Sequence, residues 1–147
     1  TDKHHEIRTS VNHLIENTKS YQLIKSVLDD KSKSAYQGKI YVNPEAQKTD
    51  GYQLSKCILL DKNTEFNAKP ELEIYADDVK CSHGSSSGSI DEDSIFYFMS
   101  RGLNRQESIK LLIEGFLSEI TDEIKSKSIK NFIVNKLEDQ LHEHKKH

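Results

Sequence analysis

The chain of 147 residues is long enough for one domain, or for one domain with a small appendage, and its formal net charge is −3. That charge gives no basis for binding to nucleic acid or to an anionic membrane surface, and the sequence has no apolar run of about 18 residues that could span a bilayer. Apolar residues make up 34% of the chain and the mean hydropathy is −0.74, which predicts an elongated or partner-dependent body with a thin core.

The sequence opens in polar residues without an initiator methionine, so we expect it to be a fragment of a longer protein. It shows no basic segment followed by an apolar one, so nothing signals the secretory route. Cys57 and Cys81 do not form a C-x-x-C pair. We expect a cytoplasmic protein, and in that compartment the two cysteines are expected to be free thiols.

Residues 1–90 carry short runs of alternating apolar and polar residues, which predict β-strands. No helical segment separates these runs, although parallel strands of an ordinary sheet need such crossovers, and hairpin dipeptides are scarce. A solenoid of stacked coils satisfies both observations, and an antiparallel sandwich remains an equal alternative. The predicted strands are Glu6–Leu14, Tyr21–Leu28, Ser34–Val42, Tyr52–Leu60 and Glu71–Val79.

The end of the last predicted strand leads into a thiol and an imidazole, Cys81 and His83. Positions i and i+2 of an extended strand face the same way, so these two groups share a face and can hold a soft metal or a sulfur species. The alternation breaks at Asp77 and Asp78, where we expect a bulge or bend that turns Cys81 and His83 inward. The alternative is structural, because a buried cysteine often serves as a small apolar residue and a strong metal site needs about four ligands.

The segment His83–Ser89 is rich in glycine and serine. A phosphate-binding loop would require a following Gly-Lys-Ser/Thr, which is absent. We interpret the segment as a flexible connector.

A helical period replaces the alternation after this segment. Asp91 or Ser89 is expected to cap a helix that has Ile95, Phe96, Phe98 and Met99 on its apolar face and ends at Gly102. Asn104 with Glu107 forms a capping-box pattern for a second helix, and Ser126 or Ser128 begins a third. The apolar positions of the last two helices are Ile109, Leu112, Ile113, Phe116, Leu117, Ile120, Ile129, Phe132, Ile133, Leu137 and Leu141.

Several other residues are of types that often have functional roles, but a structural role is the simpler interpretation of each. Cys57 lies in an apolar strand and is expected in the core, and His13 is expected to make a local hydrogen bond. Acidic residues near the last strand, such as Glu71 and Glu73, can attract iron, but outward strand charges are usually just solvated. The histidine-rich end, 142–147, is expected to be a frayed, solvated tail.

Taken together, these segments resemble the C-terminal part of the SufD members of the SufB/SufD family of iron–sulfur cluster assembly scaffolds. The resemblance covers residues from about 4 to about 124. It is strongest in Glu73–Gly84, which is more similar to SufD than to its paralogue SufB, and it departs from the family pattern at the three serines 85–87. The segments that carry it are His13 with Ser20–Leu28, Tyr36–Val42, Gln47–Gln53, Glu73–Gly84 and Ile95–Leu103.

The resemblance implies a mainly β protein with an α C-terminal domain: a right-handed parallel β-helix over residues 1–90, followed by a bundle of about three helices over residues 91–147. It implies a non-catalytic scaffold subunit that pairs with SufB through the β-helix and docks the ATPase SufC through the helices. Phe96, Arg101, Gly102 and Leu103 match the segment that we expect to contribute to SufC docking.

The resemblance also implies that Cys81 and His83 help to form a transient iron–sulfur cluster site at the interface with SufB. The alternative from another class is a purely structural subunit that holds SufB and SufC and binds neither iron nor sulfur. A β-helical enzyme such as a polysaccharide lyase is disfavoured, because the sequence shows no cluster of acidic and basic residues suited to it. Self-association of the chain as a homodimer is a further expectation, because a terminal coil has unpaired edge groups.

Overall fold

The computed structural model of the protein describes residues 3–143. The chain forms two compact units, Thr1–Ser89 and Ile90–His147. The first contains strands and the second contains helices.

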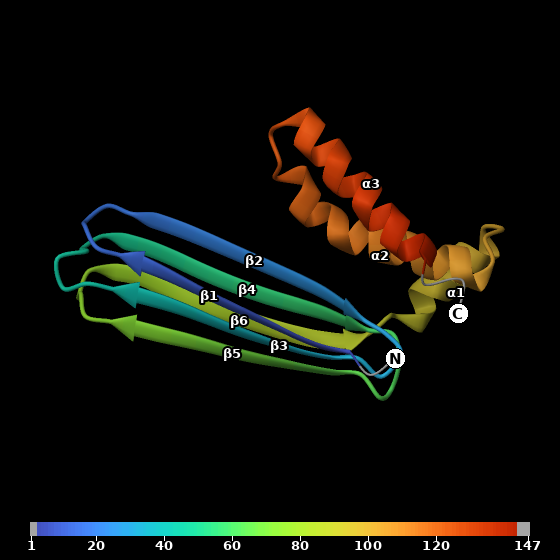
Figure 1. Ribbon diagram of the computed structural model, residues 1–147, viewed down its shortest axis with the longest axis horizontal. Helices are drawn as coiled ribbons and strands as arrows, with labels where there is room; N and C mark the ends of the chain where they lie inside the picture. The colour runs from blue at the N-terminus through green and yellow to red at the C-terminus, as the bar shows by residue number, and fades with distance from the viewer. Residues whose placement is uncertain (1–2, 144–147) are drawn as a thin grey trace. The chain divides into compact units, whose positions relative to one another are not determined.

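The first unit consists of two parallel sheets of three strands each (Figure 1). The chain alternates between the sheets: β1, β3 and β5 form one, in that order, and β2, β4 and β6 form the other. Each strand from β1 to β4 pairs in parallel with the strand two positions further along the chain. This pairing excludes the antiparallel sandwich and fits a β-helix-like fold. The strands are β1 His4–His13, β2 Lys19–Leu28, β3 Lys33–Val42, β4 Thr49–Leu59, β5 Glu65–Ile74 and β6 Val79–Ser89.

Alternation along the strands decides which side chains enter the space between the two sheets. In β3 and β4 every second residue is buried and its neighbours are only partly covered. One end of this interior is apolar and contains a core of Ile40, Val42, Ala46 and Ala76. The predicted strand periodicity is therefore confirmed, with small differences in the bounds of the first four strands. The predicted strand Glu71–Val79 is wrong, because it covers the end of β5, the corner after it and the first residue of β6.

The middle of the interior is polar. Thr9 Oγ1 donates a 2.8 Å hydrogen bond to Gln22 Oε1 and accepts one of 3.0 Å from the hydroxyl of Tyr36. Gln53 lies in the next coil, and only 2% of it is exposed. Its amide fits against Gly38, where any Cβ would lie 2.5 Å from both Gln53 Nε2 and Oε1. A Cβ at residue 38 would therefore force the Gln53 amide or the Tyr36 hydroxyl to shift.

One prediction about the end of this unit is wrong and another is confirmed. The segment His83–Ser89 is not a flexible connector, because it belongs to β6 and pairs in register with β4. Its small, polar side chains lack the apolar alternation that predicts a strand. Its backbone nevertheless pairs with β4, which makes the segment a strand. The bend predicted at Asp77 and Asp78 is confirmed, and it lies at the corner where the chain leaves β5 and enters β6.

The second unit contains three helices, α1 Glu92–Ser100, α2 Arg105–Asp122 and α3 Lys127–Glu143. Asp91 caps α1 by accepting hydrogen bonds from the backbone of Asp93 and Ser94. The helix stops before Gly102, whose φ of 100° is readily adopted only by glycine. Asn104 and Glu107 form the predicted capping box of α2, with hydrogen bonds of 3.0 and 2.8 Å.

The apolar faces of these helices are less buried than predicted. Ile95 in α1 and Ile113 in α2 are buried, whereas Phe96 is 73% exposed and Phe132 in α3 is 63% exposed. Met99 and Ile129 are exposed as well. The predicted tail begins in α3 at residue 142, and residues 144–147 lie outside the described part of the chain. Among the described residues, no helix combines the length and the apolar character needed to cross a membrane.

Candidate functional site

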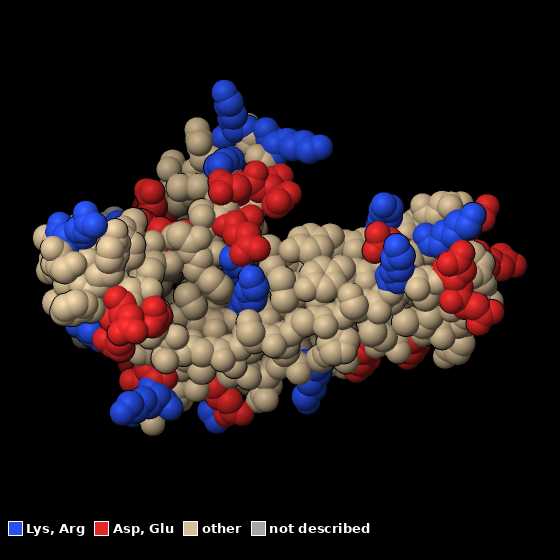
Figure 2. All heavy atoms as spheres, turned by 180° about the vertical axis from the view of Figure 1, so that it is seen from behind, with Lys and Arg blue, Asp and Glu red and all other residues tan. Residues whose placement is uncertain are grey.

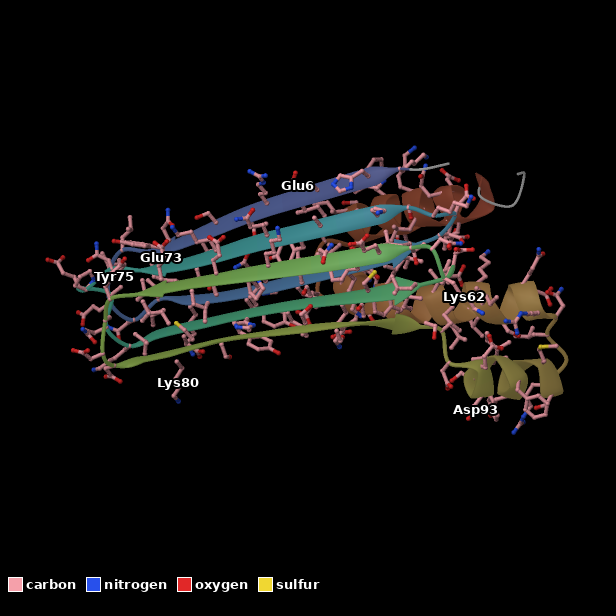
Figure 3. The ribbon with its side chains drawn as sticks, turned by 90° about the horizontal axis from the view of Figure 1, so that it is seen from below. Glu6, Lys62, Glu73, Tyr75, Lys80 and Asp93 are labelled. Carbon is pink, nitrogen blue, oxygen red and sulfur yellow. The ribbon has the colours of Figure 1, made fainter. Side chains whose placement is uncertain are left out.

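The strand β6 places Cys81 and His83 on the face that points between the two sheets. Cys81 pairs in register with Gly51 and His83 with Gln53, and both partners are buried positions of β4. Lys80, the residue before Cys81, projects away from the coil (Figure 3). The shared face predicted from the i, i+2 spacing follows from this alternation.

Cys81 lies at the edge of the apolar core. It is partly buried and packs against the core cluster together with Leu72 and Val79. Its Sγ lies 3.4 Å from the point that a Cβ on Gly51 would occupy, and His13 Nε2 lies 3.6 Å from the same point. Burial raises the pKa of the Cys81 thiol, and the backbone of Gly51 partly offsets this effect. A metal must therefore displace a proton from Cys81 in order to bind it.

His83 is exposed although its strand directs it inward. The reason is that β6 is the last strand of its sheet, just as β5 is the last of the other sheet. No further coil of the described chain stacks on this pair of strands. The two potential ligands consequently face the open end of the stack of coils.

The site holds only two candidate ligands. No group of three or more His, Cys, Asp or Glu side chains within residues 3–143 is arranged to hold a metal ion. A thiolate and a neutral imidazole both suit iron, and thiolates are the usual ligands of iron–sulfur clusters. The arrangement can contribute two ligands to a cluster that other groups complete.

Two acidic residues of the neighbouring strand β5 are already paired. Glu71 accepts a 2.6 Å hydrogen bond from Gln37, and Glu73 forms a 2.7 Å ion pair with Lys39. Glu73 lies on the outer face of its sheet, as Figure 3 shows. On the face of the molecule drawn in Figure 2, acidic and basic side chains lie next to one another, so no large patch of a single charge forms there. Glu71 and Glu73 are therefore outward strand charges with partners of their own.

The other two residues considered from the sequence are structural. His13 is 3% exposed, and its ring nitrogens lie 2.7 Å from Thr18 Oγ1 and 2.9 Å from Ser20 Oγ, which confirms the predicted local hydrogen bond. Burial lowers the pKa of His13. Cys57 is 4% exposed, and burial raises its pKa to about 11. Both residues belong to the interior of the coils.

The residues expected to contribute to docking lie at the end of α1. Phe96 is largely exposed, and the guanidinium of Arg101 lies 5.2 Å from the centroid of the Tyr97 ring. Gly102 ends the helix and Leu103 is partly buried just beyond it. This end of the helix thus presents an aromatic side chain and an arginine.

Sequence reasoning missed Gln53 as a neighbour of this site. In an alternating strand, a polar residue is normally expected to point outward. Gln53 instead points inward, and the strand register pairs it with His83. The segment Gln47–Gln53 carried part of the family resemblance, but nothing in it singled out this amide.

Comparison with known proteins identifies the class of protein that has this architecture. Residues 1–116 match the model of the SufBD core domain of the SUF system for iron–sulfur cluster assembly. The chain belongs to the SufB/SufD family, and within it the chain is SufD-like.

Several relatives support this assignment. The chain is 38% identical over 122 residues to the iron–sulfur cluster assembly protein SufD of Escherichia coli, an alignment that covers 83% of the chain and 29% of that relative. It is 40% identical over 103 residues to the SufBD family protein slr0076 of Synechocystis, covering 70% of the chain and 23% of the relative. It is 37% identical over 113 residues to the chloroplastic protein ABCI7 of Arabidopsis thaliana, covering 76% of the chain and 24% of the relative. The chain thus spans about a quarter of the length of these relatives.

Proposed function

We propose that this chain is the C-terminal part of a non-catalytic, SufD-type scaffold subunit in iron–sulfur cluster assembly. Cys81 and His83 hold iron or sulfide of a nascent cluster, and a second subunit, SufB, completes the site. The observation that carries this proposal is their common inward face on β6, the last strand of its sheet. The coils form a right-handed parallel β-helix, which is the usual hand of parallel crossovers.

The small number of ligands suits a cluster that must be passed on. A resident iron–sulfur cluster is commonly held by four cysteines within one protein. Two ligands from this chain, with the remainder supplied across an interface, allow release when the interface moves. The open end of the coils is the surface available for such a partner.

The test is anaerobic reconstitution of the full-length subunit with SufB, using ferrous iron and sulfide. We expect Cys81→Ser and His83→Ala each to lower the cluster content of the complex at least severalfold, measured by iron and sulfide analysis and by visible absorption. Cys57→Ala is the matched control, because its thiol lies in the interior and takes no part in the proposed site. Normal cluster content in both site variants would support the purely structural subunit instead.

We further propose that the helical unit docks the ATPase SufC through Phe96, Arg101 and Leu103, with Gly102 fixing the end of α1. The exposure of Phe96 and the contact of Arg101 with Tyr97 support this choice, because aromatic and arginine side chains commonly anchor interfaces. Phe96→Ala is expected to weaken SufC binding at least tenfold in a titration, whereas Ile129→Ala, at another exposed apolar residue, leaves it unchanged. Equal binding by both variants would contradict this docking surface.

The remaining assignments follow from the same proposal. The two cysteines are free, which supports a reducing compartment such as the cytoplasm. The open edges of β5 and β6 support pairing with SufB, and with a second copy of this chain when SufB is absent. Sedimentation of the isolated chain over a range of concentrations tests the homodimer, and a constant monomer mass would exclude it.

A further inference from the structure

We propose that Gln53 is a positioning residue for His83: its buried side-chain oxygen accepts the N–H of one ring nitrogen and so leaves the lone pair of the other nitrogen free to bind iron. The iron-binding half of this statement rests on the proposed function. The hydrogen bond itself concerns this chain alone.

Strand register brings the two side chains together. Gln22, Gln53 and His83 are successive partners across β2, β4 and β6, and all three occupy inward positions. Adjacent strands lie about 4.8 Å apart, so the side chain of Gln53 leaves β4 between that of Gln22 in the preceding coil and that of His83 in the following one. A glutamine side chain can span that spacing.

The oxygen of this amide lacks a partner. Gln53 is 2% exposed, and its Oε1 accepts no hydrogen bond from any described residue. An unsatisfied buried acceptor costs about 1–3 kcal/mol, so native proteins usually supply a donor. His83 is a neighbouring residue in the same inward row that can supply one.

The next position along the same ladder shows that such a bond forms. Ser55 and Ser85 follow Gln53 and His83 by two residues and face the same interior. Ser55 Oγ donates a 3.0 Å hydrogen bond to Ser85 Oγ. Side chains of β4 and β6 therefore reach one another directly on this face.

A second donor competes for the same oxygen without excluding His83. Gln22 Nε2, on the opposite side of Gln53, is also buried and without a hydrogen-bond partner among the described residues. A carbonyl oxygen has two lone pairs and can accept two hydrogen bonds. One bond from Gln22 and one from His83 would satisfy both unpaired atoms.

The chemical consequence concerns the tautomer of His83. In metal sites, the histidine ring nitrogen that does not bind the metal commonly donates to an oxygen, which fixes the orientation of the ring and its tautomer. With one N–H directed at Gln53 Oε1, the opposite nitrogen is unprotonated and faces away from Gln53. Gln53 thereby prepares His83 for a ligand at the open end of the coils.

The test is the tautomer of His83 in the metal-free chain, read from its ¹⁵N imidazole shifts by NMR at about pH 8.5, above the usual titration range of histidine. We expect one neutral tautomer to dominate in the wild type. Gln53→Met keeps the length of the side chain but removes the oxygen, so the tautomer ratio should fall by about fivefold. Gln53→Glu restores an acceptor and should restore the dominant tautomer. Gln37→Met, at a half-buried outward position of β3 that bonds Glu71 instead, should leave it unchanged.

Unaltered ¹⁵N shifts of His83 in Gln53→Met would overturn the proposal. If that variant does not fold, Gln53→Asn gives the same measurement, because it retains the amide but draws its oxygen back by one methylene. A changed tautomer in Gln53→Met, together with normal cluster content in His83→Ala, would support the positioning role and refute the cluster site. An unchanged tautomer in Gln53→Met, together with loss of the cluster in His83→Ala, would refute the positioning role and support the cluster site.

Discussion

Ser55 Oγ in β4 donates a 3.0 Å hydrogen bond to Ser85 Oγ in β6. This bond joins an inward position of the coil interior to a segment whose composition is typical of a linker. The serine and glycine residues of β6 therefore belong to a paired strand and not to a linker.

Hydrogen exchange should show that β6 is ordered. Amides of residues 79–89 that bond to β4 are expected to exchange at least tenfold more slowly than an unstructured peptide of the same sequence, because each must open before it exchanges. NMR or mass spectrometry of the chain in deuterated water measures this directly. Unprotected amides throughout the segment would restore the connector interpretation.

A substitution at Gly38 should destabilise the coils. An alanine Cβ there would overlap the Tyr36 hydroxyl and the Gln53 amide, so Gly38→Ala should lower the free energy of unfolding by about 1–3 kcal/mol in urea. Gly88→Ala in β6 is the control, since no atom lies within 4 Å of its added Cβ, and it should be nearly neutral. Equal effects at both glycines would mean that the interior layer can relax around the methyl group.

The buried thiol of Cys57 should make the fold sensitive to alkali. Burial raises its pKa from 9.0 to about 11, so above pH 9 the unfolded chain loses this proton before the folded one does. This contribution to stability is complete below pH 9 and should fall by about 1.4 kcal/mol per pH unit until the folded thiol also ionises. Urea unfolding at several pH values measures the slope, and Cys57→Ala should remove that part of it. An unchanged slope in the variant would assign the effect to other groups.

The capping box should account for part of the stability of α2. Asn104→Ala removes the acceptor for the backbone N–H of Glu107 and should lower the free energy of unfolding of the helical unit by about 1 kcal/mol. Gln106→Ala, at an exposed position in the same first turn, should have little effect. Thermal unfolding followed by circular dichroism compares the two variants. Similar melting curves for both would show that packing alone fixes the start of the helix.

The sequence was informative wherever local chemistry determines structure. Alternation predicted four strands correctly, and the cap at Asp91, the box at Asn104 and the stop at Gly102 predicted the helix ends. Alternation could not separate parallel coils from an antiparallel sandwich, because both bury every second residue. The parallel pairing decides between them.

Some features of the candidate site were likewise predictable from local sequence, and others were not. The common face of Cys81 and His83 follows from a spacing of two residues on a strand. The position of Gln53 beside His83 depends on the pairing of two strands 30 residues apart in sequence, for which one sequence carries no local signal. The sequence assigned Phe96 both to an apolar helix face and to a docking surface. Packing covers only part of that helix face, so Phe96 stays exposed, as the docking expectation requires.

The polar layer of Thr9, Tyr36, Gln22 and Gln53 also has a consequence for how the coils find their alignment. Sliding β4 by two residues against β2 would bring Gln53 beside Ser20 or Ile24 instead of Gln22 and would separate the amides. Sliding it by one would turn Gln53 outward and bury Tyr52 or Leu54 in its place. An all-apolar interior would tolerate the first of these shifts more easily, so this band of amides and hydroxyls selects one stacking of the coils and, with it, the level at which Cys81 and His83 emerge.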